Sequence, residues 1–266
     1  WESFYNNSLT HYLSSKRNGR KGRDEQKGES LDENDEEEDE DEDDSDPGTS
    51  WFTEHNAPQK VLDFMTSDRF PLAPEHTHAD TQPTILDLGT GNGSMLTLLR
   101  EEGEFAGPMV GVDYSIKSVE LARQLNERNP ELQDIRFEEW DILDPKHEED
   151  ICRGVFGKDI AWFPYGDGGF DVVLDKGTFD AVSLSGEGGD KRICEKYPGI
   201  ALRLVKKGGF FIITSCNWTE NELVEWFTLT GKDGFIVYDR VEYPKFRFGG
   251  QEGQGVCTIC FQRRDI

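Results

Sequence analysis

The sequence predicts an α/β protein built on a mostly parallel sheet with helices on both faces. From residue 84 onward, short apolar runs alternate with amphipathic segments of helical spacing, which is typical of strand–helix–strand units. The last two apolar runs, 235–243 and 255–263, have no helical segment between them. We therefore expect one antiparallel strand at the end of an otherwise parallel sheet.

The first fifty residues divide into two parts of contrasting composition. Residues 1–15 place aromatic and aliphatic side chains near helical spacing, which predicts a short amphipathic helix packed on the main domain. Residues 16–50 consist mostly of Gly, Ser, Arg, Asp and Glu, with too little apolar surface to offset the entropy cost of ordering. We expect 16–50 to be a disordered acidic loop, inserted between the helix and a main domain at 51–266.

Each further element follows from its local pattern. The predicted strands are the apolar runs 84–88, 109–113, 135–140, 170–175 and 210–214, followed by the two final runs. Helices are predicted at 94–102, from Ser115 to about Asn129, near 191–205 with a bend at Pro198, and at 220–229. Gly208 and Gly209 should end the third of these helices. Residues 161–169 (AWFPYGDGG) are expected to form a surface insertion.

The charge balance restricts the kind of partner. The formal net charge is −25, and residues 24–46 contain sixteen Asp and Glu against one Lys. A general nucleic-acid binder would present a basic surface to phosphates, so we expect no nucleic-acid partner. The balance favours a basic protein partner that the acidic chain attracts from a distance.

Other classes are excluded by composition. Five cysteines among 266 residues do not make a disulfide scaffold. No stretch of about 18 apolar residues could cross a membrane, so we expect no membrane partner and a cytoplasmic monomer. Cys257 and Cys260 are spaced like metal ligands but lack a second ligand pair. We interpret both as small buried residues of a strand and predict no metal site.

The first strand runs directly into a glycine-rich turn, residues 87–93 (DLGTGNG). Glycines at the carboxyl end of a parallel strand let the backbone approach a ligand closely. The G-x-G-x-G spacing departs from the G-x-G-x-x-G of dinucleotide-binding folds, and the Asp87 carboxylate would repel a pyrophosphate but attract an ammonium or sulfonium. We expect Asp87, Gly89, Thr90 and Gly91 to bind S-adenosylmethionine; a nicotinamide-dependent oxidoreductase is the alternative.

Acids at the ends of successive strands support a nucleoside site. Asp113 lies 22 residues after Gly91, a spacing at which an ionised carboxylate can accept both ribose hydroxyls. Tyr114 should border the same site. Asp141 could accept the adenine amino group while Ile142 packs on the ring.

These residues resemble a known family. The glycine loop and the strand-end acids resemble the seven-β-strand class of S-adenosylmethionine-dependent methyltransferases. The segments DKGTFDAVSL (175–184), ITSCNWT (213–219) and PKFRFGG (244–250) are similar to protein-lysine methyltransferases that modify translation elongation factor 1-alpha, the Efm4/See1-like, METTL10-like group. The resemblance covers about residues 51–266 and the helix at 1–15, but not the segments 16–50 and 154–169.

The resemblance implies a Rossmann-like sheet of seven strands with an antiparallel last strand. It also implies cofactor contacts at Gly89, Gly91, Asp113 and the Asp141–Ile142 pair, with the segment at Trp51 and Phe52 lying over the cofactor pocket. The implied reaction transfers a methyl group from S-adenosylmethionine to a lysine, leaving S-adenosylhomocysteine.

The segments after the fourth and fifth strands should border the transferring methyl group. Asp175 is the candidate for orienting the acceptor amine or the methionine end of the cofactor, and Asn217 is a second candidate through its amide oxygen. The aromatic rings of Phe179, Trp218 and Phe246 could form the walls of a desolvating pocket that lowers the pKa of the acceptor lysine. Strand-end capping by Asp175 and core packing by the aromatic rings are the structural alternatives.

Two other functions also fit the sequence. One is a methyltransferase of the same fold that acts on another protein, a small molecule or a nucleic acid. The other is a non-catalytic module that binds the cofactor or a partner, with the acidic loop as its working part. Substituting Asp113 would distinguish an enzyme, which loses turnover, from a module that keeps its partner.

Overall fold

The computed structural model describes residues 2–21, 52, 54–146, 160–185, 192–229, 234–244, 246–248, 251–253 and 255–265. For residues 15–21, 54, 185, 192–193, 246–248 and 251–253 it describes the backbone alone. Trp51 therefore lies outside the described residues, as do the side chain of Phe246, residues 22–50 and residues 154–159.

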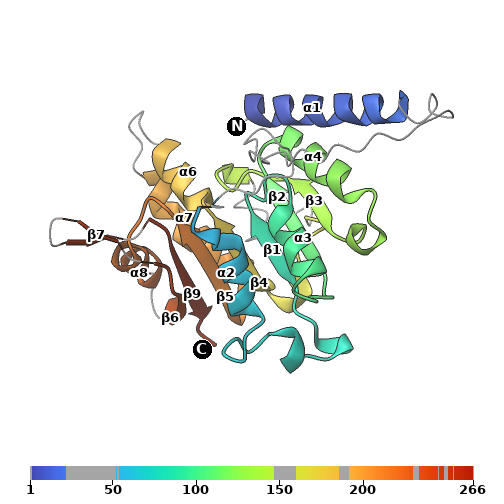
Figure 1. Cartoon of the computed structure of the whole chain (residues 1–266). Coiled ribbons are helices and arrows are strands. Elements are labelled where there is room, and N and C mark those ends of the chain that lie inside the picture. Colours follow the sequence, from blue (N-terminus) through green and yellow to red (C-terminus); the bar gives the residue numbers. More distant parts are fainter. Residues whose placement is uncertain are drawn as a thin grey trace, which may run out of the picture.

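A seven-stranded sheet forms the centre of the molecule (Figure 1). Its order is β3-β2-β1-β4-β5-β9-β6, with β9 antiparallel to both of its neighbours and the remaining pairs parallel. The strands are β1 (Ile85–Leu88), β2 (Met109–Asp113), β3 (Arg136–Glu139), β4 (Phe170–Lys176), β5 (Val205–Ser215), β6 (Phe235–Val241) and β9 (Cys257–Arg263). The predicted Rossmann-like sheet, mostly parallel with an antiparallel last strand, is confirmed.

Among the described residues, three helices pack on each face of the sheet, where they cover side chains that alternate between the two faces along each strand. Ile85 packs with the helices α2 (Ala57–Met65), α3 (Ser94–Glu101) and α4 (Ile116–Asn126). Leu86 packs on the other side, with α6 (Thr178–Ser185), α7 (Arg192–Leu204) and α8 (Glu220–Thr228). Smaller elements are the 3₁₀ helices Glu54–Asn56, Pro74–His76, Ala79–Thr81, Pro130–Leu132 and Tyr165–Asp167, and a separate hairpin of β7 (Phe246–Phe248) and β8 (Gln251–Gly253).

The N-terminal helix α1 (Glu2–Lys21) lies across α4 (Figure 1). Tyr5 and Leu9 form a small apolar cluster with Leu121 of α4, and the Tyr12 hydroxyl donates a hydrogen bond to the Gln124 carbonyl at 3.2 Å. The helix extends to Lys21, beyond the predicted end at residue 15.

Two local predictions are wrong. Gly208 and Gly209 lie inside β5, because the register between β4 and β5 shifts so that Phe170 pairs with Val205 but Val172 pairs with Phe210. Gly208 accommodates this irregularity at φ +77°. The segment 161–169 was predicted to lie on the surface, but Trp162 and Phe163, near its beginning, are buried in the core. Trp162 packs edge-on against Trp140, with ring centroids 5.6 Å apart.

Candidate active site

A cavity of about 580 Å³ lies at the carboxyl ends of β1 to β5. The chain reverses its strand order here, because β2 and β3 extend from one side of β1 while β4 and β5 extend from the other. Open α/β sheets bind their ligands at such a switch point. The lining residues include the glycine loop, the segments that follow β2, β3 and β4, and the loop after β5.

The glycine loop is shaped by close approaches that exclude side chains. Gly89 and Gly91 have φ values of +63° and +59°, which L residues rarely adopt. A Cβ atom at Gly91 would lie 2.8 Å from the Tyr5 hydroxyl oxygen. The loop is also fixed to its neighbours, because Thr90 donates its backbone N–H to the Val112 carbonyl at 3.0 Å and Ser118 donates its hydroxyl to the Gly91 carbonyl at 2.6 Å.

The Asp113 carboxylate is held in place beside this loop. One oxygen accepts a hydrogen bond from the Gly91 backbone N–H at 3.0 Å, and the other accepts one from Ser115 at 2.9 Å. Burial raises the pKa of Asp113, and these backbone hydrogen bonds oppose the rise. The carboxylate keeps further lone pairs that could accept two hydroxyl groups of a ligand in the cavity.

The edge of the cavity beyond β3 combines a polar and an apolar group. Asp141 lines the cavity and accepts the Leu143 backbone N–H at 2.8 Å, which fixes its side chain. Ile142 is buried next to it and presents an apolar surface. This pair could hold a flat heteroaromatic ring by one hydrogen bond and one packing face. Tyr114 also lines the cavity, with its side chain half exposed.

The opposite end of the cavity is formed by α6 and the loop after β5. The Asp180 carboxylate accepts hydrogen bonds from the Ser215 hydroxyl at 2.6 Å and the Cys216 backbone N–H at 2.9 Å, which ties α6 to the loop. Asp180 and Asn217 line the cavity together with the exposed side chain of Leu184. This end offers a carboxylate, an amide and an apolar rim.

Known proteins share this architecture. A methyltransferase-domain family model matches residues 79–243. Protein-lysine N-methyltransferase EFM4 of Saccharomyces cerevisiae is 36% identical over 83% of this chain and 85% of its own length. EEF1A lysine methyltransferase 2 of Danio rerio is 35% identical over 83% of this chain and 79% of its own length. The human protein of that name is 32% identical over 82% of this chain and 77% of its own length.

The chain belongs to the Efm4-like family of protein-lysine methyltransferases. This family was predicted from the glycine loop and three short segments, and the prediction is confirmed. Among solved structures, the methyltransferase domain of bacterial CtHen1-CN has a TM-score of 0.52 at 15% identity. The match covers 77% of this chain and 97% of that one, and it supports the fold.

In this Efm4-like methyltransferase, most predicted site residues gather around one cavity. Those that line it are Gly89, Thr90, Gly91, Asp113, Tyr114, Asp141, Ile142 and Asn217. Asp87 lies behind the glycine loop, where the Thr90 hydroxyl donates to its carboxylate at 2.8 Å, and it does not line the cavity. Burial raises the pKa of Asp87 to about 6, although the nearby Lys176 opposes the rise.

Asp175 does not line the cavity either, and its predicted contact with the reacting groups stays a prediction. Its buried carboxylate accepts hydrogen bonds from the Tyr197 hydroxyl at 2.5 Å and from the Thr178 and Phe179 backbone N–H groups at 2.8 and 3.2 Å. Asp175 therefore caps the start of α6 and anchors it to α7. Burial raises the pKa of Asp175 to about 7.

Of the three aromatic residues predicted as pocket walls, Phe179 lies in the core and Trp218 packs against it, while the side chain of Phe246 lies outside the described residues. Phe179 is fully buried and stacks on Trp218, with ring centroids 5.6 Å apart and planes 27° apart. Phe179 also meets Tyr197, Trp226 and Phe227. Neither Phe179 nor Trp218 is among the lining residues, because the rings that follow β4 and β5 pack toward α7 and α8.

The lining residues that were missed include Tyr5, which reaches the cavity from α1, Lys176 and Asp180. Phe52, which the resemblance implied to lie over the cofactor pocket, is among the lining residues and lies above Gly177, where a Cβ atom would be 2.6 Å from its ring. Lys176 ends β4 with its ammonium 5.7 Å from the Phe52 ring centroid. Asp180 could have been predicted as a lining residue if residues 178–185 had been predicted as a helix. Phe179 and Val182 would then mark the face of that helix that packs in the core, and Asp180 lies on another face. No local pattern in the sequence predicts that Tyr5 lies beside the glycine loop.

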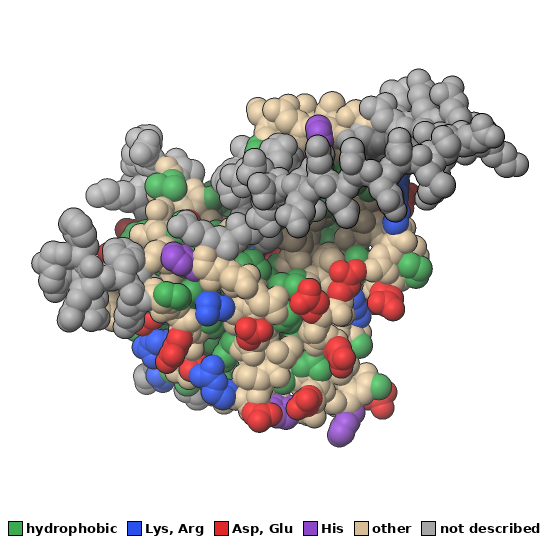
Figure 2. Space-filling view, in the orientation of Figure 1, with side chains coloured by type: hydrophobic (Ala, Val, Ile, Leu, Met, Phe, Trp, Pro, Cys, Tyr) green, Lys and Arg blue, Asp and Glu red, His purple; other side chains and the backbone are tan. Residues whose placement is uncertain are grey.

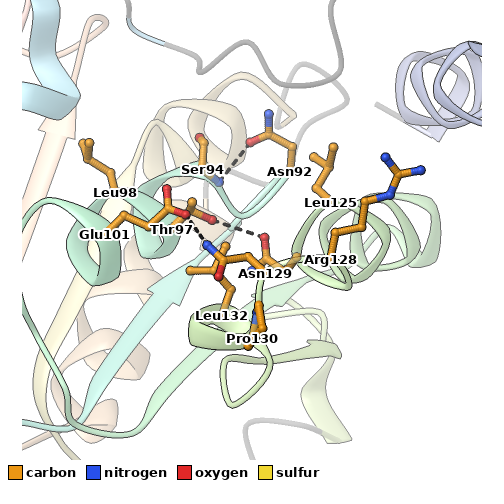
Figure 3. A pocket seen from close by; sticks show the side chains of 11 residues that line it. Asn92, Ser94, Thr97, Leu98, Glu101, Leu125, Arg128, Asn129, Pro130 and Leu132 are labelled. Carbon is orange, nitrogen blue, oxygen red and sulfur yellow. Dashed lines mark hydrogen bonds between the residues drawn. The ribbon is translucent and has the colours of Figure 1, made fainter. Parts of the chain in front are cut away.

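A second cavity of about 530 Å³ lies between α3 and the end of α4 (Figure 3). Its polar groups bind one another: Asn129 donates to the Glu101 carboxylate at 2.6 Å, and Thr97 donates to the Asn126 amide oxygen at 3.3 Å. It lies on the helical side of the glycine loop and away from the strand ends. We therefore assign the active site to the first cavity.

The described residues contain no group of three His, Cys, Asp or Glu side chains that could hold a metal ion. Cys257 and Cys260 are free thiols that pack on opposite faces of the sheet, so they could not share an ion. In the part of the chain that the structure describes, no helix is both long and apolar enough to span a bilayer.

Proposed function

We propose that this protein transfers a methyl group from S-adenosylmethionine to a lysine side chain of translation elongation factor 1-alpha. The observation that carries this proposal is the similarity of 82–83% of the chain to relatives named for EEF1A or protein-lysine methylation. The cavity supports it, because one end suits a nucleoside and the other end suits an amine.

The residues at the nucleoside end fit the cofactor. The glycine loop leaves no space for side chains, Asp113 would accept the ribose hydroxyls, and Asp141 with Ile142 would hold the adenine. When bound, S-adenosylmethionine supplies an electrophilic methyl group on a sulfonium.

The acceptor end must receive a lysine and favour its neutral form. Neutralising a free lysine at pH 7 costs about 4–5 kcal/mol, because its pKa is near 10.4. Asp180 would attract the arriving ammonium, and the apolar side chains of Val182 and Leu184 would desolvate it, which lowers its pKa. Asn217 would orient the amine through its amide oxygen. Alignment of the two reactants supplies the remaining rate enhancement.

The charge of the protein fits a basic protein substrate. Figure 2 shows Asp and Glu side chains spread over one face rather than gathered in a single patch, and the formal net charge of the chain is −25. A molecule of this charge repels nucleic acid and attracts basic surfaces. We infer that the enzyme works as a cytoplasmic monomer on a protein and not on nucleic acid.

The test is transfer of a labelled methyl group to purified elongation factor 1-alpha. We expect label on a lysine with the unmodified enzyme, and a loss of at least about 100-fold with Asp113→Ala, since that substitution removes hydrogen bonds to charged groups. Asp80→Ala, at an exposed position outside the cavity, is the matched control and should retain activity. Cofactor binding without label on the factor would exclude this substrate and favour another protein or a small molecule as acceptor.

A further inference from the structure

The cavity is lined by three carboxylates and one basic side chain among the described residues. The carboxylates belong to Asp113, Asp141 and Asp180, and the basic side chain belongs to Lys176. S-adenosylmethionine carries one carboxylate of its own, on its methionyl group. Within this cavity, that negative group is repelled by the ionised acids and attracted only by Lys176 among the charged side chains that line it.

The position of Lys176 matches the end of the cavity at which such a carboxylate would lie. Lys176 is the last residue of β4, which pairs with β1 on the side away from β2. Asp113 is the last residue of β2, so the two residues end strands on opposite sides of the glycine loop. Two strand spacings, about 10 Å, separate these strands. We place the adenine beside Asp141 and Ile142, beyond β3, and the ribose beside Asp113, at the end of β2. The amino-acid end of the ligand then points the other way, toward β4.

The surroundings of Lys176 favour an incoming anion. Its ammonium lies over the Phe52 ring at 5.7 Å, which keeps the side chain beside the cavity. Asp87 and Asp175 are its acidic neighbours, but both are buried carboxylates whose pKa values are raised. Burial lowers the pKa of Lys176 in spite of those two acids. A ligand carboxylate in the cavity would add a further attraction to this ammonium.

We propose that Lys176 binds the carboxylate of the methionyl group and makes the site selective for nucleosides that carry an intact amino acid. Lys176 would therefore position the cofactor and set its specificity. This inference rests on the proposed binding of S-adenosylmethionine at the cavity.

The test compares two ligands that differ only in the carboxylate, S-adenosylmethionine and its decarboxylated form. Isothermal titration calorimetry gives the dissociation constant of each ligand for the unmodified protein and for Lys176→Met, Lys176→Arg and Asp113→Ala. We expect the unmodified protein to prefer S-adenosylmethionine by about 10- to 100-fold, the range of one hydrogen bond between charged groups. In Lys176→Met the preference should fall to about 3-fold or less, because that side chain keeps the length but not the charge.

The other two variants separate the possible outcomes. Lys176→Arg retains a cation and should keep most of the preference, and Asp113→Ala should weaken both ligands by a similar factor and leave their ratio unchanged. An unmodified protein that binds both ligands equally, or a ratio unchanged in Lys176→Met, would overturn the proposal. If Lys176→Met does not fold by circular dichroism, Lys176→Gln, which also removes the charge, takes its place, and an unchanged ratio in that variant overturns the proposal. If neither ligand binds the unmodified protein, the proposed function itself fails.

Discussion

The Gly89 backbone passes directly under Thr178, whose hydroxyl donates a hydrogen bond to the Leu88 carbonyl at 2.6 Å. A Cβ atom at Gly89 would lie 2.1 Å from that hydroxyl oxygen, at a φ of +63°. We expect Gly89→Ala to lower the free energy of unfolding by about 2–4 kcal/mol through steric overlap and backbone strain. Urea unfolding measures this change.

Gly166→Ala is the matched control for that substitution. A Cβ atom at Gly166 would meet nothing within 4 Å. The control should therefore change stability by less than about 0.5 kcal/mol. Equal effects of the two substitutions would contradict the close approach between the glycine loop and α6.

Asp175 predicts a specific dependence of stability on pH. The pKa of Asp175 is about 7 in the folded protein, whereas an Asp in an unfolded chain has a pKa of about 3.9. Between these two pH values the folded state holds a proton that the unfolded state releases. This contribution to stability is complete below about pH 4 and is lost as the pH rises toward 7. In Asp175→Asn, which cannot ionise, the free energy of unfolding should fall less between pH 4 and 7 than in the unmodified protein.

Urea unfolding at a series of pH values measures this difference. The exposed Asp63 on α2 provides the control, because Asp63→Asn removes a surface carboxyl and should not reproduce the change in slope expected for Asp175→Asn. Parallel curves for Asp175→Asn and the unmodified protein would show that the Asp175 carboxyl is not neutral in the fold.

At the scale of elements, α1 contributes Tyr5 to the cavity but is held by few apolar contacts. Leu9 is buried against α4, whereas Leu13 on the same helix is 41% exposed. Leu9→Ala should weaken the docking of α1 on α4, because it removes buried apolar surface. The state in which Tyr5 lines the cavity is then less populated, so the dissociation constant for S-adenosylmethionine should rise by about 3- to 10-fold. Leu13→Ala should leave the constant within about 2-fold.

Calorimetric titration measures both constants, and thermal unfolding measures the main domain. Leu9→Ala should lower the melting temperature of the main domain by only a few degrees, since α1 contacts α4 rather than the sheet. An affinity that stays the same in Leu9→Ala would mean that the position of α1 does not affect cofactor binding.

The elements show why the sheet could be predicted and half of the site could not. The strand ends are encoded locally, by apolar runs that stop at an acid or a glycine, so the ends of β1, β2 and β3 and the residues after them were predicted. The orientation of Asp175 depends on Tyr197, which is 22 residues away in sequence and visible only after folding. Tyr5 reaches the cavity through packing across a long chain distance, for which a single sequence carries no periodic signal. Phe52 was expected there only because of the family resemblance.

At the scale of the whole molecule, the acidic charge should govern encounter with a basic substrate. With a net charge of −25, kcat/KM for methyl transfer to elongation factor 1-alpha should fall by about 10-fold or more between 20 and 300 mM salt. The dissociation constant for S-adenosylmethionine should change much less, because its site is partly buried. Steady-state kinetics and titration at the same salt concentrations separate the two effects. A kcat/KM that is independent of salt would exclude steering by charge.

The roof of the cavity is shared by two chain segments, Tyr5 on α1 and Phe52, with residues 22–51 between them in the sequence. Because α1 and the main domain belong to one chain, the docking of α1 on α4 does not depend on the protein concentration. A single cut between Lys21 and Phe52 would remove this advantage without breaking any described contact. The helix would then become a separate peptide ligand of α4, and closure of the active site would depend on how much of that peptide is present.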